Sequence, residues 1–216
     1  MKKIFGIIVI TMISFAAFFA SSSDYKEGEH YTKVSDKLSS KPEVREFFSF
    51  YCPHCFKFEP FFEDVKKQLP KEVKFIRNHV DFLRSASPEI QFMLTKAVVV
   101  AKQLNVEKMI VGKIFNYVHV QRASFASERD IRNVFVLNGV DGAAFDKAFK
   151  SFATNSQAKQ MKKIQDYFAN KRAITGVPAT IVNGKYRINT QALKNSSTEA
   201  AVADYVKLVK YLQTLD

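Results

Sequence analysis

The sequence predicts an α/β fold in which an all-helical domain is inserted between the two halves of one sheet. Residues 31–80 show the order strand, strand, helix, strand, and the last three elements form a strand–helix–strand unit. Residues 85–165 then carry helical patterns only. Strands return on either side of Asn183–Gly184, the strongest short hairpin signal in the chain. The sheet is therefore expected in two parts, with the helices between them.

Three strands and one helix are expected in the first part. The strands cover 31–34, 43–51 and 73–80, where short apolar or β-branched runs are bounded by turn signals. The helix covers 53–69, because large apolar side chains recur there at helical spacing. Pro60 lies inside this helix and should kink it.

Five helices are expected in the insertion. Their starts are marked by Ser87, by Ser127 with Asp130 three residues later, and by Asp141. Asn155 is expected to cap the last and longest helix, which runs towards residue 173. Of the other four, the first starts at Ser87-Pro88-Glu89 and continues over 90–104, and the second covers 106–118. The third follows Ser127 and is stopped by Asn138-Gly139, and the fourth covers 143–152.

The second part of the sheet is expected to be a hairpin followed by one helix. Its strands cover 179–182 and 185–188. The final helix begins at Thr198 and carries apolar residues along one face, so it should pack on the sheet.

The two cysteines of the chain lie close together in Cys52-Pro53-His54-Cys55, after an apolar strand and at the start of a helix. This is the arrangement of a redox-active dithiol. Cys52 lies where unpaired helix N–H groups favour negative charge, so it is the candidate nucleophile, and Cys55 is the candidate resolving thiol. Pro53 suits the first helical turn. His54 can donate a hydrogen bond or place a positive charge beside Cys52, which lowers the pKa of that thiol and makes the disulfide oxidising.

Two other interpretations of the cysteine pair remain open. A zinc site would need four ligands, but there is no second cysteine pair and the four histidines show no paired spacing, so no metal is expected. A purely structural disulfide would close a loop too short to constrain the unfolded chain much. Glu46 is also ambiguous, because an acid inside an apolar strand can pair with a cation or can move protons below the dithiol.

Charge and the N-terminus indicate where the chain works. The net charge is +12, but lysines and arginines are scattered in short pairs, which predicts a solvated basic face and no nucleic-acid partner. Residues 1–22 have the pattern of a signal peptide, with Lys2 and Lys3 before an apolar stretch and small residues at the end. An uncleaved membrane anchor is the alternative. Export would place the dithiol in an oxidising compartment.

The element order and three motifs together resemble the DsbA family of periplasmic thiol oxidases. The motifs are Glu46-Phe47-Phe48-Ser49-Phe50, Cys52-Pro53-His54-Cys55, and Gly176-Val177-Pro178-Ala179 followed by Val182-Asn183-Gly184-Lys185-Tyr186. The match extends over nearly the whole chain after residue 22. It implies a thioredoxin-like domain made of residues 23–84 and 166–216, with the helical insertion over 85–165.

The resemblance also implies roles for residues outside the dithiol. Pro178 would follow a cis peptide bond and lie against the dithiol, and Val177 would offer its backbone to an extended substrate chain. Glu46 matches the buried acid of the family, and Glu59 matches a second acid near the site. Arg77 stands where relatives have a lysine, and because arginine keeps its proton, a proton relay through this position is in doubt.

The implied activity is donation of the Cys52–Cys55 disulfide to newly exported proteins with free thiols, in the periplasm, through a mixed disulfide on Cys52. A membrane quinone-linked partner resembling DsbB would reoxidise the dithiol, no cofactor would be needed, and the protein would be a monomer. A disulfide isomerase or reductase is the alternative, although such isomerases usually add an N-terminal dimerisation domain and little chain precedes Tyr31. A non-catalytic chaperone or adhesion module is a third hypothesis.

Overall fold

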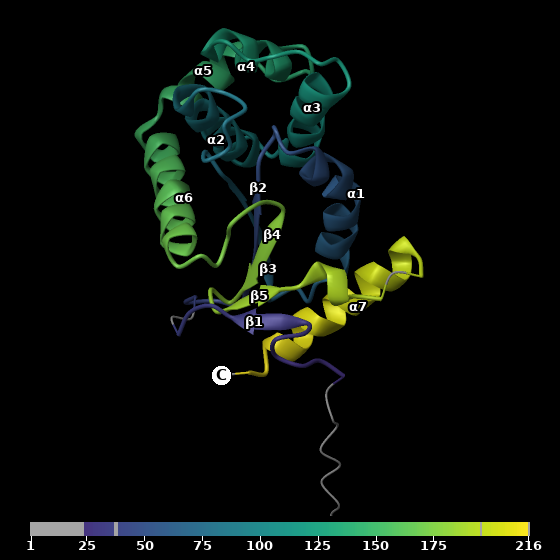
Figure 1. Cartoon of the computed structure of the whole chain (residues 1–216). Helices are drawn as coiled ribbons and strands as arrows, with labels where there is room; N and C mark the ends of the chain where they lie inside the picture. The colour runs from purple at the N-terminus through teal and green to yellow at the C-terminus, as the bar shows by residue number, and fades with distance from the viewer. Residues whose placement is uncertain (1–23, 37–38, 195, 216) are drawn as a thin grey trace, which may run out of the picture.

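The computed structural model describes residues 24–36, 39–194 and 196–215. The predicted signal peptide, residues 1–22, lies outside the described residues. The described chain has one five-stranded sheet with helices on both faces and a block of helices over one end (Figure 1). No helix in the described ranges is long and apolar enough to cross a membrane.

The strand order of the sheet is β1-β5-β4-β2-β3. The strands are β1 (Tyr31–Lys33), β2 (Glu43–Phe48), β3 (Lys74–His79), β4 (Ala179–Val182) and β5 (Tyr186–Ile188). β2 and β3 are parallel, as a strand–helix–strand unit requires, and all other pairs are antiparallel. The predicted α/β fold with a helical insertion is confirmed, since β3 and β4 are separated in the chain only by helices.

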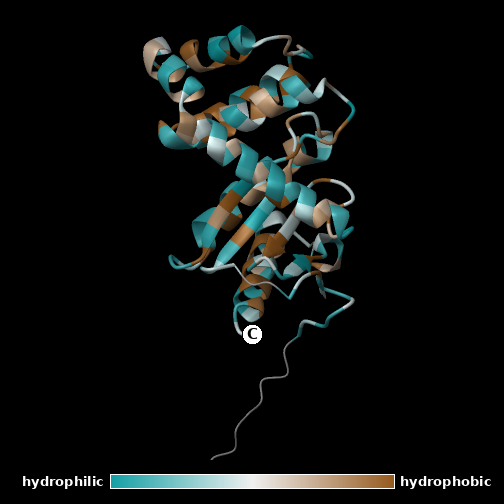
Figure 2. Ribbon diagram, turned by 90° about the vertical axis from the view of Figure 1, so that its left-hand side faces the viewer, coloured by the Kyte–Doolittle hydropathy of each residue, from teal (hydrophilic) through white to brown (hydrophobic). Residues whose placement is uncertain are grey.

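Two helices cover one face of the sheet, and a third covers the other. On the first face, α1 (Pro53–Gln68) packs beside α7 (Thr198–Leu212), and their apolar side chains share a core with β2. On the other face, α6 (Phe152–Asn170) places Phe168 against Phe47 of β2, with ring centroids 5.6 Å apart. Brown and teal segments alternate along the helices, which is the pattern of amphipathic elements packed on shared cores (Figure 2).

The helical block consists of α2 (Pro88–Gln103), α3 (Glu107–His119), α4 (Glu128–Val136) and α5 (Gly142–Lys150), together with α6. Its buried core contains large apolar residues from every helix and also includes Phe48, Phe50, Cys52 and Cys55. The dithiol therefore lies at the junction between the sheet and the helical block. The predicted boundary at residues 165 and 166 falls inside α6, and the division into domains stays a prediction.

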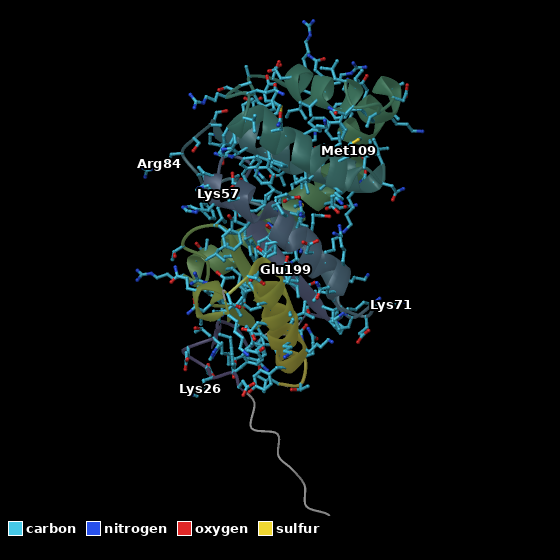
Figure 3. The ribbon with its side chains drawn as sticks, turned by 90° about the vertical axis from the view of Figure 1, so that its right-hand side faces the viewer. Lys26, Lys57, Lys71, Arg84, Met109 and Glu199 are labelled. Carbon is cyan, nitrogen blue, oxygen red and sulfur yellow. The ribbon has the colours of Figure 1, made fainter. Side chains whose placement is uncertain are left out.

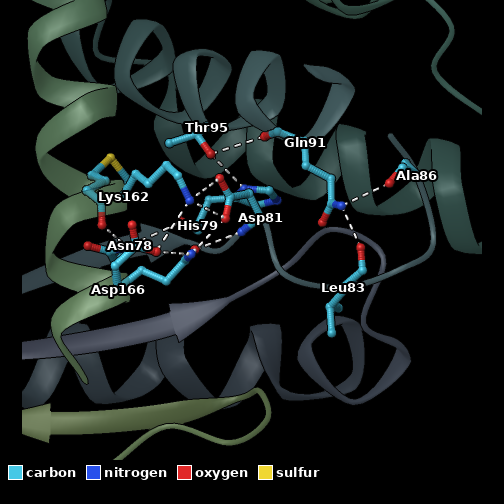
Figure 4. Close-up of polar contacts among 11 residues, drawn as sticks. Asn78, His79, Asp81, Leu83, Ala86, Gln91, Thr95, Lys162 and Asp166 are labelled. Atoms are coloured by element: carbon cyan, nitrogen blue, oxygen red, sulfur yellow. Dashed lines mark hydrogen bonds and ion pairs between the residues drawn. The ribbon is translucent and has the colours of Figure 1, made fainter. Parts of the chain in front are cut away.

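Buried polar contacts connect the end of β3 to this block (Figure 4). The side-chain amide of Asn78 donates to the Met161 carbonyl at 3.1 Å. His79 Nδ1 lies 2.9 Å from the Thr95 hydroxyl, which donates to the Gln91 carbonyl at 3.1 Å. We call Asn78, His79, Thr95 and Gln91 the neutral cluster. Burial lowers the pKa of His79 to about 3, so this imidazole carries no charge.

Three details differ from the sequence prediction. β2 ends at Phe48 and not at residue 51, because the chain turns there and the Cys52 N–H donates to the Ser49 carbonyl at 3.1 Å. Asn155 does not cap the long helix, so that prediction is wrong: Ser151 is the cap, and its hydroxyl accepts from the Thr154 N–H at 3.1 Å. A short 3₁₀ helix over Thr190–Ala192 was not expected.

Charged side chains are spread over the surface, as the sequence suggested. Lys26, Lys57, Lys71 and Arg84 lie at the edges of different parts of the molecule (Figure 3). These four cations belong to different parts of the chain, so the positive charge is not confined to one element.

Candidate active site

Cys52 is the N-cap of α1, and its position follows from local structure. Its backbone is extended, at φ −92° and ψ 112°, and Pro53 occupies the first turn of the helix. The Cys52 sulfur accepts a hydrogen bond from the Cys55 backbone N–H at 3.2 Å. It therefore replaces the usual capping oxygen and receives an N–H that the helix leaves unpaired.

The two thiols are reduced in this structure and have opposite acidities. The hydrogen bond from the Cys55 side chain contributes most to lowering the pKa of Cys52 to about 6, against the effect of burial. The backbone N–H groups of Cys55 and His54 and the charge of His54 lower it further. Burial, and then the hydrogen bond to Cys52, raise the pKa of Cys55. Near neutral pH, Cys52 is therefore the thiolate and Cys55 the thiol.

A segment from the far end of the helical block completes the site. The Val177–Pro178 peptide bond is cis, as the resemblance implied. The Cys52 sulfur lies 3.2 Å from the Val177 carbonyl oxygen, to which it donates a hydrogen bond when it is protonated. The structure thus brings together six residues named from the sequence, namely Cys52, Pro53, His54, Cys55, Val177 and Pro178.

Four ionisable side chains form a second group, on the face of the sheet that α1 covers. Glu46 of β2 and Arg77 of β3 are directly opposite each other in the sheet register, and Glu59 and Glu63 come from α1. Arg77 donates to Glu59 at 2.9 Å and to Glu63 at 3.0 Å, and its Nε lies 3.6 Å from Glu46 Oε2. We call these four residues the charged cluster.

Burial dominates the electrostatics of the charged cluster. It raises the pKa of Glu46 to about 8, although Arg77 opposes this shift, and Glu59 and Glu63 add to it. Burial also raises the pKa of Glu59, again against the effect of Arg77. For Arg77, burial opposes the charge, but the carboxylates outweigh it and raise the pKa further. Arg77 therefore keeps its proton, and Glu46 is the member that can exchange one near neutral pH.

Two residues at the site were not anticipated from the sequence. Glu63 binds Arg77, and the only signal for it was its spacing four residues after Glu59, on the same face of α1. His119, at the end of α3, has its Nε2 2.8 Å from the Phe50 carbonyl. Its ring stacks on Phe56 with centroids 5.1 Å apart and planes within 9°. His119 therefore connects the helical block to both sides of the dithiol, a contact that only the tertiary structure reveals.

Two grooves lie beside the dithiol. The first, of about 390 Å³, is lined by Pro178 and by residues of α1 and β5. The second, of about 490 Å³, lies between α1 and the start of α7, and the two share Phe58 and Thr190. Lys57, Arg187 and Lys194 line the grooves, whereas no acidic side chain of the described residues does. The pair forms a basic, partly apolar path away from the cis proline.

No group of three or more metal-binding side chains is present in the described ranges. An acidic thiol, a buried partner thiol and a protonated buried carboxyl group form a set suited to thiol–disulfide exchange.

Comparisons with known proteins agree with this chemistry. A family model described as "DSBA-like thioredoxin domain" matches residues 43–205. The thiol:disulfide interchange proteins DsbA of Salmonella typhi and Escherichia coli K12 are 40% and 36% identical over 215 residues, covering 98% of each chain. The crystal structure of the Proteus mirabilis disulfide oxidoreductase DsbA superposes with a TM-score of 0.76 at 34% identity, covering 88% of this chain and 97% of that one.

Proposed function

Because the chain belongs to the DsbA family, we propose that Cys52 is the sulfur atom through which it passes its disulfide to other proteins. The chain is a thiol:disulfide oxidoreductase that forms disulfides. The observation that supports Cys52 in this role is the acid thiol at the N-cap of α1, next to a thiol that is almost completely buried. Cys52 is 6% exposed against 1% for Cys55, and of the two thiols it is the one whose pKa is lowered, to about 6.

The proposed cycle follows from these acidities. A client thiolate attacks Cys52 in the oxidised protein, the Cys52–Cys55 bond breaks, and Cys55 takes up the electron pair and a proton. A second client thiolate then attacks the client sulfur of the mixed disulfide. Cys52 leaves as a thiolate, which is stable because its pKa is low, and the client keeps the new disulfide.

Val177 and the basic grooves supply the place for the client chain. The Val177 carbonyl lies within hydrogen-bond distance of Cys52, so an extended chain whose cysteine reaches Cys52 passes the backbone of this segment. The grooves continue from Pro178 along α1. A structure of the Proteus mirabilis relative contains the non-covalently bound peptide PWATCDS, which includes a cysteine. That a relative binds a cysteine-containing peptide supports placing the clients of this chain along the grooves beside Pro178.

The clients are newly exported proteins with free thiols, and the compartment is the periplasm. The predicted signal sequence and the family of the relatives support this location. A membrane partner that passes electrons to a quinone, resembling DsbB, would return the dithiol to its disulfide form. The protein acts as a monomer without a cofactor in this proposal.

The isomerase or reductase alternative is not favoured. The relatives reported above carry the DsbA name, and a low Cys52 pKa stabilises the reduced form, which makes the disulfide a strong oxidant.

A thiolate titration tests the role of Cys52. The absorbance of the thiolate is followed against pH in the reduced protein, with Cys52→Ser as the blank. The expected midpoint is about 6. A midpoint near the value of a free cysteine, about 8.5, would contradict the proposal. Cys55→Ala should raise the midpoint more than His54→Ala does, because the Cys55 side chain is the largest contribution and His54→Ala keeps the backbone N–H.

A further inference from the structure

Arg77 is oriented towards α1 rather than towards its neighbour in the sheet. Its two terminal nitrogens donate to Glu59 and Glu63, at 2.9 and 3.0 Å. Only Nε faces Glu46, at 3.6 Å, and neither Nε nor Glu46 Oε2 has a hydrogen-bond partner among the described residues. The side chains of Arg77 and Glu46 are each 2% exposed, so bulk solvent does not reach the two unpaired atoms.

Three carboxyl groups therefore share one guanidinium. If all were ionised, the buried group would carry a net negative charge, which a low-dielectric site disfavours. The other ionisable groups around Glu46 do not change this balance. Tyr205 of α7 adds a neutral hydroxyl and Glu107 of α3 adds a further acid. Lys66, which acts on Glu59, is paired with Glu107 at 3.5 Å.

Glu46 is the carboxyl group that retains a proton. The Glu46 side chain is the most buried of the three carboxyl groups, and it lies farthest from Arg77. The elevated pKa of Glu46 agrees with this assignment, and Glu63 is among the groups that raise it. Glu46 also acts electrostatically on Cys55, the thiol that needs a proton when the disulfide opens.

We propose that Glu63 is a positioning residue of the disulfide-opening step, because its carboxylate draws the charge of Arg77 towards α1 and so leaves Glu46 protonated on the strand that leads to the dithiol. In that step, the client–Cys52 bond forms, the Cys52–Cys55 bond breaks, and the electron pair moves to the Cys55 sulfur. The proton moves from the Glu46 carboxyl group to Cys55. The new carboxylate then lies beside the free Nε of Arg77, and it takes up another proton from solvent. This inference rests on the function proposed above.

Glu63→Gln is the variant that tests this role. The amide still accepts a hydrogen bond from Arg77 but carries no charge, so the guanidinium is shared by one acid fewer. The titration of Glu46 is followed by carbon NMR of glutamate-labelled protein, with Glu46→Gln to assign the signal. The opening rate of the disulfide is followed against pH with a small dithiol.

The expected result is a lower midpoint for Glu46 in Glu63→Gln, and an equal displacement of the pH at which the opening rate begins to fall. Each unit of displacement is about a tenfold loss of the protonated fraction above the midpoint. Asp64→Asn is the matched control. It removes the same charge from the next position on α1, but Asp64 is exposed and pairs with Lys67 at 2.6 Å. Its curves should match those of the wild type.

Equal displacements in Glu63→Gln and Asp64→Asn would overturn the proposal, as would no displacement in either. If Glu63→Gln does not fold, Glu63→Ala serves instead, because it also removes the carboxylate that shares Arg77, and the same downward displacement is expected. The Cys52 titration separates this test from that of the function. If the Cys52 thiolate of the wild type titrates near pH 6 but Glu63→Gln changes neither curve, the proposed role of Glu63 is wrong and the proposed function still stands.

Discussion

The charged and neutral clusters begin at adjacent residues of one strand, yet they differ in kind. Arg77 of β3 meets three acids, whereas Asn78 and His79, the next two residues, meet a carbonyl and a hydroxyl. The neutral cluster is buried throughout, and in the charged cluster Glu46 and Arg77 are buried while Glu59 and Glu63 are half-buried. The helix on each side supplies the difference, since α1 presents acids and α2 presents Thr95 and Gln91. The charged cluster thus lies in the strands and helix that lead to the dithiol, whereas hydrogen bonds of neutral side chains contribute to attaching β3 to the helical block.

The largest expected effect comes from removing the one cation of the charged cluster. Arg77→Met leaves three buried acids without a counter-charge and should lower the free energy of unfolding by about 3–5 kcal/mol at pH 8. The loss should be smaller at pH 5, where the acids can take up protons. Urea unfolding of the reduced protein measures both values. Lys71→Met, an exposed change of the same charge, is the control, and an equal loss in both variants would contradict the distinction between the clusters.

Glu46→Gln should act in the opposite direction, by stabilising the protein at high pH. Folding raises the pKa of Glu46 from 4.5 to about 8, so the folded state keeps a proton that the unfolded chain has lost. Stability of the wild type therefore falls as pH rises through this window. The variant lacks that fall and should gain up to about 5 kcal/mol above pH 8, at about 1.4 kcal/mol per unit.

Urea unfolding at a series of pH values measures this gain. Near pH 4 the two proteins should be equally stable. A constant difference between them at all pH values would mean that Glu46 does not titrate with folding.

A smaller and pH-independent effect is expected in the neutral cluster. Thr95→Val keeps the shape of the side chain but removes the hydroxyl, which leaves His79 Nδ1 buried without its partner. The expected loss is about 1–3 kcal/mol. It should be the same at pH 5 and pH 8, since burial already keeps His79 neutral over that range. A loss that changes with pH would show that this cluster carries charge after all.

The smallest effect distinguishes the two thiols. Glu46 is among the groups that raise the pKa of Cys55, whereas the main influences on the pKa of Cys52 are Cys55, burial and His54. Glu46→Gln should therefore leave the thiolate titration of Cys52 within the scatter of repeated measurements. A clear shift of that titration would mean that the charged cluster influences the acidity of both sulfur atoms, and its effect could not be assigned to Cys55 alone.

Much of the fold follows from local patterns in the sequence. The dithiol helix, the Asn183–Gly184 hairpin and the helical insertion all carry their own start and turn signals, and the structure has each of them. The errors occur where tertiary contacts decide. Ser151 and Asn155 are both good caps, and the choice depends on where α5 ends. The apolar run after Phe48 contains no break, so the turn to Cys52 is not visible.

The site shows the same limit. Cys52, Cys55 and His54 form a local motif, and their placement could be predicted from spacing alone. Glu63 could not, because an acid on a helix is usually solvated, and only the packing of α1 on β3 turns it towards Arg77. His119 lies more than sixty residues away in sequence from the carbonyl that it contacts, so no local pattern could place it.

In the proposed cycle, the burial of Cys55 also determines how long the mixed disulfide with a client lasts. Once a client is attached to Cys52, the attachment can end in two ways: the client's own second cysteine can complete the disulfide, or Cys55 can release the client unchanged. Release requires the Cys55 thiolate, which burial and the neighbouring sulfur make scarce. The joined pair consequently persists while the client chain searches for its second cysteine. A client with a single cysteine is still released by slow attack of Cys55 on the mixed disulfide. The same buried sulfur therefore leaves time for clients with two cysteines and still frees clients with one.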